Sequence, residues 1–306
     1  RGASLPKIAA TRGYGADVRL VGTTVDDALA AAEEFARDTG AVLIHPFDHP
    51  DIVCGQATIG LEILEQCPQV RTVVVGAGGG GLAAGIGVVI KALRPEVRVV
   101  AVQAEKAAAL ARSVRAGSVV QLSEVATIAD GIAVGHPGRL TVPMVSRYVD
   151  EIRTVSEESL AHAVLAFLER AKLVVEPAGA AGLAAMLDDP GAFPPPVVVV
   201  ASGGNVDPIL LVRILRHGLA AAGRYLSFEV TLPDRPGALA GLLRTLADAE
   251  ANVLDVVHER TRASLAIDEV EVALQVETRG PEHSREVLAT LTSLGYLPDG
   301  AGPAAS

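Results

Sequence analysis

Up to residue 219, the hydrophobic positions follow two patterns that alternate along the chain. Short apolar runs rich in β-branched residues predict strands, and apolar positions three or four residues apart predict helices. Strands that alternate with helices predict an α/β fold with an open, mostly parallel sheet and a site at the carboxyl ends of its strands. By this pattern the strands are expected at residues 17–21, 41–44, 73–75, 97–103, 151–155 and 197–201, the helices at 6–12, 24–40, 52–66, 82–93, 107–116, 157–171 and 177–190, and an irregular segment at 118–143.

The glycine-rich stretch after Val75 is the most informative part of the chain. Val73–Val75 predicts a strand buried on both faces, and residues 197–201 predict a second buried strand. Four consecutive glycines, Gly78–Gly81, then remove side chains where the backbone must approach something closely. The helix that follows directs its unpaired N–H groups and its positive dipole end at this loop. The stretch therefore predicts a cradle for an anion, most simply a phosphate.

Two cofactor classes are compatible with this loop. Gly76, Gly78 and Gly81 satisfy the dinucleotide pattern G-x-G-x-x-G, and Glu105 follows at roughly the spacing that this pattern requires, so an oxidoreductase is one alternative. Ser202 favours a second cofactor class. It follows the strand at 197–201, so it should lie at the same edge of the sheet as the glycine loop. A phosphate site with a neutral hydroxyl nearby suits pyridoxal 5'-phosphate, whose ring nitrogen would accept the hydrogen bond, although serine there is also a common helix N-cap.

The pattern changes after residue 224 and indicates a second domain. Residues 226–232 alternate, with Phe228, Val230 and Leu232 on one face, and a turn at 234–237 leads into a helix at 238–249. Strands are expected at 252–260 and 269–278 and a last helix at 281–294. The order β-α-β-β-α-β predicts a small ferredoxin-like domain. We place the domains at residues 1–222 and 225–298, joined at 220–223.

Composition and charge limit the kinds of molecule that this chain is expected to bind. The 306 residues are 50% hydrophobic, and the formal net charge of -10 disfavours nucleic acid and anionic membranes. We expect no membrane span. Cys54 and Cys67 are too few for a disulfide framework and lack metal-ligand spacing, so we expect them in the core of a cytoplasmic protein with no metal site. A small-molecule substrate is the partner that remains.

The motifs resemble the pyridoxal-phosphate enzymes of the tryptophan-synthase β fold, and within them the threonine dehydratases (threonine ammonia-lyases). Residues 78–82 (Gly-Gly-Gly-Gly-Leu) are similar to the family's phosphate loop, and residues 202–205 (Ser-Gly-Gly-Asn) to its pyridine-nitrogen segment. Residues 176–180 (Glu-Pro-Ala-Gly-Ala) match its segment near the ring, and the similarity extends over nearly all of residues 1–219. Residues 225–297 resemble an ACT domain.

The resemblance implies particular roles for particular residues. It implies deamination of L-threonine to 2-oxobutanoate and ammonia, in isoleucine biosynthesis or threonine catabolism, with allosteric regulation by an effector such as isoleucine or valine. It also implies a homo-oligomer. The implied cofactor contacts are Gly78, Gly79, Gly80, Gly81, Leu82, Glu176 and Ser202, and the implied effector contacts are Asp234, Gly237, Ala238 and Leu239. For Glu176, a structural role before the proline is an equal alternative.

One element of the family is missing from this sequence. The Schiff-base lysine and the substrate-carboxylate loop belong upstream of Arg1, and none of Lys7, Lys91, Lys106 and Lys172 matches either motif. We therefore expect that this chain contains no catalytic residue and that the catalytic lysine lies upstream of it. We also expect this fragment to be inactive alone. A serine dehydratase or racemase of the same fold and a non-catalytic amino-acid sensor remain alternatives. The acidic metal cluster of related racemases is also absent after Glu105.

Overall fold

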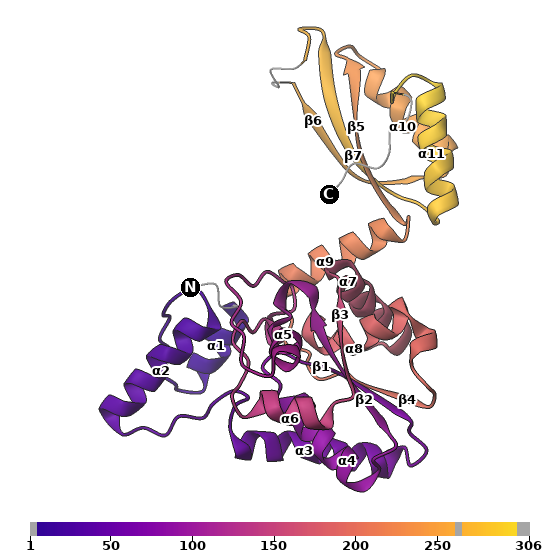
Figure 1. The fold of residues 1–306 in the computed structure, drawn as a ribbon. Helices are drawn as coiled ribbons and strands as arrows, with labels where there is room; N and C mark the ends of the chain where they lie inside the picture. Colours follow the sequence, from indigo (N-terminus) through magenta and orange to yellow (C-terminus); the bar gives the residue numbers. More distant parts are fainter. Residues whose placement is uncertain (1–4, 261–264, 299–306) are drawn as a thin grey trace. The chain divides into compact units, whose positions relative to one another are not determined.

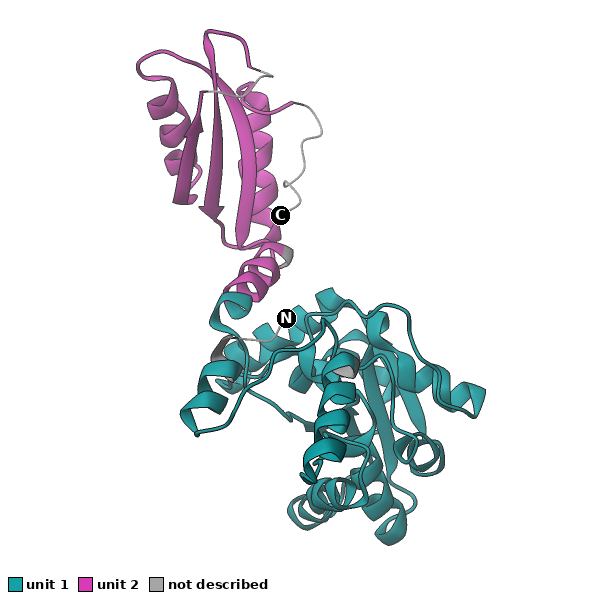
Figure 2. Ribbon diagram, turned by 90° about the vertical axis from the view of Figure 1, so that its left-hand side faces the viewer, with its two compact units in different colours: residues 1–211 teal, residues 212–306 magenta. Residues whose placement is uncertain are grey.

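A computed structural model describes residues 5–260 and 265–298 of the chain (Figure 1). It divides into two compact units, residues 1–211 and 212–306 (Figure 2), which are described separately. The division falls inside helix α9 (Pro208–Ala221), which ends within the join that we expected at 220–223. The domain limits 1–222 and 225–298 therefore stay a prediction.

The first unit is an α/β domain. Its helices are α1 (Leu5–Gly13), α2 (Val25–Thr39), α3 (Pro50–Gln66), α4 (Gly81–Leu93), α5 (Ala109–Ala116), α6 (Thr141–Tyr148), α7 (Glu157–Ala166) and α8 (Pro177–Asp188). Its strands are β1 (Thr72–Gly76), β2 (Arg98–Ala104), β3 (Glu151–Val155) and β4 (Val197–Val200). Short turns are η1 (Glu105–Ala107), η2 (Asp130–Ile132) and η4 (Pro190–Ala192), and a π-helical segment, η3 (Phe167–Ala171), extends α7.

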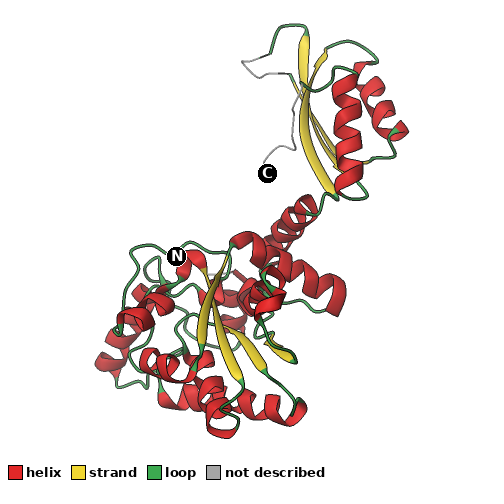
Figure 3. Cartoon of the chain, turned by 45° about the vertical axis from the view of Figure 1, so that its right-hand side comes forward, coloured by secondary structure: helices red, strands yellow, loops and turns green. Residues whose placement is uncertain are grey.

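The four strands form one parallel sheet in the order β3-β2-β1-β4, with helices on both faces (Figure 3). All of β1 is buried, and Val73 and Val75 pack in the same core cluster as Ile86 and Ile90 of α4. On the other face, α8 lies so close to β1 that a Cβ on Gly182 would be 3.2 Å from the Val74 carbonyl oxygen. The predictions of a parallel sheet and a buried central strand are confirmed.

Glycines also let α4 approach its neighbours closely. A Cβ on Gly85 would lie 2.6 Å from the carbonyl oxygen of Val53 in α3, and one on Gly87 would lie 2.7 Å from that of Tyr148 at the end of α6. Any side chain at either position would therefore displace backbone. The helix that begins at the glycine loop is packed against backbone on two sides.

Two strand predictions are wrong. Residues 17–21 and 41–44 are not in strands, although the predicted helix between them is present and begins with a capping box of Thr24 and Asp27. A strand needs a neighbour with which to exchange backbone hydrogen bonds, and no described segment pairs with either of these. Their apolar side chains are consequently exposed, Val42 by 88% and Ile44 by 77%.

Three further expectations need correction. Residues 197–200 form a strand, but it is only half-buried because β4 is the edge of the described sheet. Helix α6 begins inside the segment 118–143, which we expected to be irregular. Cys54 is exposed and Cys67 half-buried, so neither is a core residue. No described helix is long and apolar enough to cross a membrane.

The second unit is an antiparallel sheet with helices on one face (Figure 3). Its elements are β5 (Tyr225–Pro233), α10 (Ala238–Asp248), β6 (Asn252–Glu259), β7 (Glu269–Glu277) and α11 (Pro281–Ser293), and the sheet order is β5-β7-β6. The predicted inward positions of β5 are buried: Phe228 and Val230 are 2% exposed and Leu232 is 3% exposed. The final strand of the predicted order is absent from residues 296–298, and residues 299–306 lie outside the described part of the chain.

Candidate functional site

Two loops emerge side by side at the carboxyl edge of the parallel sheet. Strands β1 and β4 are neighbours, and Val75 pairs with Val200 close to the end of each strand. The glycine loop follows β1 and the segment that begins at Ser202 follows β4. Because both strands run in the same direction, the two loops reach the same edge, which is where open α/β sheets bind ligands.

The glycine loop presents a run of backbone amides without protein partners. Residues 78–81 are buried, and in the described part of the chain no N–H group of residues 78–82 donates to a protein acceptor. Gly80, the N-cap of α4, has a φ of 98° and no side chain that could cap the helix. Buried amides are almost always hydrogen-bonded, so a row of unpaired ones at a helix N-terminus is a site for an anionic oxygen group.

Neighbouring segments pack tightly against the loop glycines. The Phe47 ring lies where a side chain on Gly79 would be, and a Cβ on Gly78 would be 2.9 Å from the Ile132 Cα. Thr141 donates a hydrogen bond from its hydroxyl to the Gly79 carbonyl oxygen. These contacts hold the loop in one shape, which sequence spacing did not reveal because the partners are far away along the chain.

Glu176 and the Ser202 loop are in direct contact. The backbone N–H of Glu176 donates to the Gly203 carbonyl oxygen at 2.9 Å, and the Glu176 carboxylate occupies the space beside Gly203. Ser202 itself is exposed, and its hydroxyl makes no hydrogen bond to the described residues. The hydroxyl is therefore available to a ligand.

Turn η2 lies between the two loops. Its Ile132 adjoins Gly78, and a Cβ on Gly131 would be 3.2 Å from a carboxylate oxygen of Glu176. The predicted contacts at residues 78–82, Glu176 and Ser202 are therefore gathered around the end of β1 and β4. Unpaired amides, a free hydroxyl and a carboxylate are groups that fit a phosphorylated pyridine such as pyridoxal 5'-phosphate.

The lysines whose side chains the structure describes do not lie among the predicted site residues. Lys91 pairs with Asp150 at 2.7 Å, Lys172 donates to the Glu169 carbonyl oxygen at 2.8 Å, and Lys106 is exposed in η1. The Lys7 side chain lies outside the described part of the chain. Among the described residues, no group of three His, Cys, Asp or Glu side chains could hold a metal ion.

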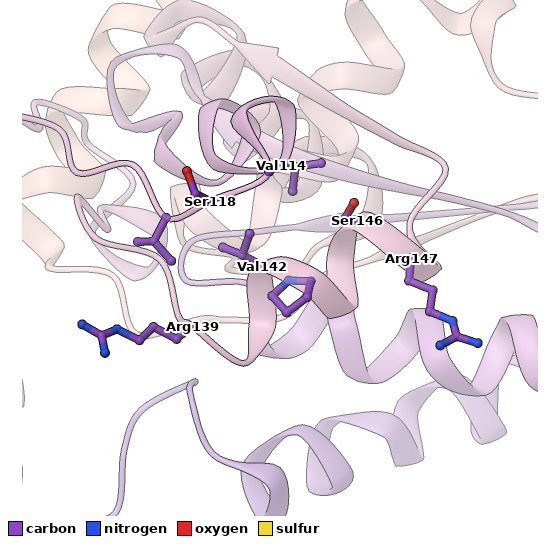
Figure 4. Close-up of a pocket in the computed structure, with 9 residues that line it drawn as sticks. Val114, Ser118, Arg139, Val142, Ser146 and Arg147 are labelled. Atoms are coloured by element: carbon purple, nitrogen blue, oxygen red, sulfur yellow. The ribbon is translucent and has the colours of Figure 1, made fainter.

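A separate cavity of about 590 Å³ lies between α6 and the end of α5 (Figure 4). Arg139 and Arg147 lie on either side of it, and Ser118 and Ser146 contribute hydroxyl groups. No residue of the predicted site lines it. It is open to solvent, and we assign it no ligand.

The second unit has its own cavity at the predicted effector turn. Asp234, Gly237, Ala238 and Leu239 line it together with His258 and Arg260. Arg260 donates two hydrogen bonds to the Asp234 carboxylate, at 2.9 and 3.1 Å. The sequence prediction missed His258 and Arg260, because both belong to β6 or its end and no local motif marks them.

Family models match both units. The model described as pyridoxal-phosphate dependent enzyme matches residues 1–203, and the ACT domain model matches residues 227–295. The chain is 45% identical over 294 residues to L-threonine ammonia-lyase of Geobacter sulfurreducens, covering 96% of this chain and 73% of that protein.

Solved structures agree with these matches. A crystal structure of threonine deaminase from T.th. is 40% identical, with a TM-score of 0.62 over 66% of this chain and 67% of that chain. Maize serine racemase is 33% identical, with a TM-score of 0.64 over 72% of this chain and 69% of that chain.

The ion pair at the turn makes a prediction about titration. The hydrogen bonds from Arg260 hold the pKa of Asp234 below its ordinary value, so the pair contributes stability above the unfolded carboxyl pKa and loses it as the pH falls through the folded pKa. In Arg260→Gln we expect the pKa of Asp234 to rise toward about 3.9, as measured by carboxyl ¹³C NMR titration. Arg279→Gln, which removes the partner of Glu250, should leave the Asp234 midpoint unchanged. An unchanged midpoint in Arg260→Gln would contradict the assignment.

Proposed function

This chain belongs to the family of pyridoxal-phosphate dependent enzymes, and we propose that it serves the deamination of L-threonine to 2-oxobutanoate and ammonia. The observation that carries the proposal is the run of unpaired amides at residues 78–82, next to the loop of Ser202 that follows the neighbouring parallel strand. The likeness to L-threonine ammonia-lyase supports the choice of reaction.

Each residue of the site has a physical task in this proposal. The amides of residues 78–82 bind the phosphate through hydrogen bonds and the positive end of the α4 dipole. When bound, the cofactor supplies a conjugated ring that accepts the negative charge left at the substrate Cα. The Ser202 hydroxyl would donate to the ring nitrogen and, being neutral, would leave it unprotonated. Glu176 fixes the Ser202 loop through its backbone bond to Gly203.

Removal of the Cα proton requires a base that we do not find among the described side chains. The Lys91 amino group is committed to Asp150, and Lys106 and Lys172 are exposed. We propose that a lysine outside residues 1–306 supplies this base. The chain then binds the cofactor without turning the substrate over.

This proposal is tested by assaying residues 1–306, saturated with pyridoxal 5'-phosphate, for 2-oxobutanoate formation from L-threonine. We expect none above the rate of the free cofactor. Measurable turnover would contradict the proposal and would make Lys7 the first lysine to replace, because its side chain lies outside the described part of the chain.

Two alternatives from the sequence remain: a racemase or serine dehydratase, and a sensor. The greater coverage of the alignment with L-threonine ammonia-lyase weighs against the first of them. A serine dehydratase or racemase of the same fold is supported by the likeness to maize serine racemase, which covers 72% of this chain. The alignment with L-threonine ammonia-lyase covers 96% and therefore includes the ACT unit. A non-catalytic amino-acid sensor would bind an effector but no pyridoxal 5'-phosphate.

For the ACT unit we propose binding of an amino acid such as isoleucine or valine at the turn 234–239. The turn places the start of α10 beside the Asp234 carboxylate. The ligand's carboxylate would therefore face the positive end of the helix dipole, and its ammonium group would face the Asp234 carboxylate. Isoleucine is the effector that we expect if the enzyme is biosynthetic. We also propose a homo-oligomer, since ACT domains pair between subunits in this family.

The role of Ser202 is tested by cofactor affinity. We expect Ser202→Ala to weaken pyridoxal 5'-phosphate binding about twofold to tenfold, the value of one neutral hydrogen bond. Fluorescence titration measures this. Ser146→Ala, which removes an exposed hydroxyl from the cavity of Figure 4, is the matched control and should bind as the wild type does. Equal affinities for both variants would remove Ser202 from the site.

The effector proposal is tested by calorimetry on the full chain. We expect isoleucine or valine to bind, and Asp234→Asn to weaken that binding at least fivefold, because an ionised partner for the ammonium group is lost. Glu250→Gln changes a carboxylate that pairs with Arg279 and does not line the cavity, so it should leave binding intact. Absence of heat with both amino acids in the wild type would argue for a docking module instead.

A further inference from the structure

We propose that Asp48 is a positioning residue for the glycine loop and acts through the N-terminus of α6. The inference rests on the proposed cofactor site, because the loop in question is the one that would hold the phosphate. Asp48 lies in the segment that connects the N-terminal helices to α3, far from the glycine loop along the chain. No local motif would associate the two.

Asp48 supplies the N-cap that α6 lacks. The helix begins at Thr141, and its own N-cap residue, Leu140, has helical backbone angles and no capping side chain. The Asp48 carboxylate accepts hydrogen bonds from the backbone N–H groups of Arg139 at 3.0 Å, Leu140 at 2.9 Å and Thr141 at 3.1 Å. A carboxylate at a helix N-terminus is stabilised by these donors and by the helix dipole.

The helix end that Asp48 holds is the one that contacts the glycine loop. Thr141 is fully buried and donates its hydroxyl to the Gly79 carbonyl oxygen, and the Gly138 N–H donates to the same oxygen at 3.4 Å. A carbonyl oxygen with two donors from one helix end is fixed in direction. Asp48 therefore acts on Gly79 through a single intervening turn.

The geometry of the peptide unit carries this effect to the anion site. The Gly79 carbonyl and the Gly80 N–H belong to the same planar, trans peptide group, so they point in opposite directions. Fixing the carbonyl toward Thr141 thus fixes the Gly80 amide on the other side of the loop. That amide is one of the unpaired donors of residues 78–82.

The loop that carries Asp48 is itself braced. The His45 Nδ1 accepts the N–H of Asp48 at 2.7 Å and that of Phe47 at 3.2 Å, and the His45 and Phe47 rings meet edge to face at 4.7 Å. The Phe47 ring also covers Gly79. The carboxylate is therefore held on a short, hydrogen-bonded turn whose other side chain touches the same glycine.

The test compares Asp48→Asn, Thr141→Val and Thr141→Ser in the full chain with two measurements. One is hydrogen exchange at residues 78–82 without cofactor, and the other is pyridoxal 5'-phosphate affinity by fluorescence titration. We expect Asp48→Asn and Thr141→Val to speed exchange and to weaken binding roughly tenfold, the scale of one lost hydrogen bond to a charged or buried group. Thr141→Ser keeps the hydroxyl and should restore both values.

Asp150→Asn is the matched control. Asp150 also accepts a backbone N–H, that of Val99 at 2.7 Å, and pairs with Lys91, but it lies at the start of β3, at the opposite edge of the sheet. It should lower stability without altering exchange at residues 78–82. Equal changes in Asp48→Asn and Asp150→Asn, or none in Asp48→Asn, would overturn the positioning role. Faster exchange in Asp48→Asn and Thr141→Val, but not in Asp150→Asn, supports it even if the wild type binds no pyridoxal 5'-phosphate, a result that would overturn the proposed cofactor site alone.

Discussion

The parallel pairing of β1 with β4 is the constraint on which the site depends. These strands are distant in sequence, and only their register brings the glycine loop and the Ser202 loop to one edge. Valines fill both strands because β-branched side chains pack well on a covered sheet. The core that they form fixes the positions of two loops that contribute only backbone groups and one hydroxyl. The sheet therefore sets where the two loops lie, and the neighbours packed against the glycine loop set its shape.

Most of the architecture could be predicted from the sequence. The capping box at Thr24 and Asp27, the N-cap at Ser156 and the alternation of β5 are local signals, and the structure has all three. The extended segments 17–21 and 41–44 could not be judged in this way. Apolar residues in an extended run indicate that a strand is possible, but pairing depends on a partner elsewhere.

The sequence likewise predicted part of the site, namely the residues that lie in contiguous motifs, and missed its long-range contacts. The glycine run and Ser202 stand out because strand, loop and helix are contiguous, so the composition of the loop already indicates an anion. The contacts of Phe47 and Thr141 with the loop, and of Asp48 with the start of α6, have no such local signal, since each joins segments that lie far apart along the chain. The Arg260 partner of Asp234 was missed for the same reason. Long-range polar contacts have no period and no spacing that a sequence pattern could contain.

The two glycines inside α4, Gly85 and Gly87, restrict how this protein can vary. A glycine within a helix costs about 1 kcal/mol relative to alanine, so helix stability alone would favour replacing both. Backbone from α3 and α6 leaves no room for the replacement. Descendants of this sequence are therefore held to a helix that is weak by itself, and its neighbours must change together if it is ever to be strengthened.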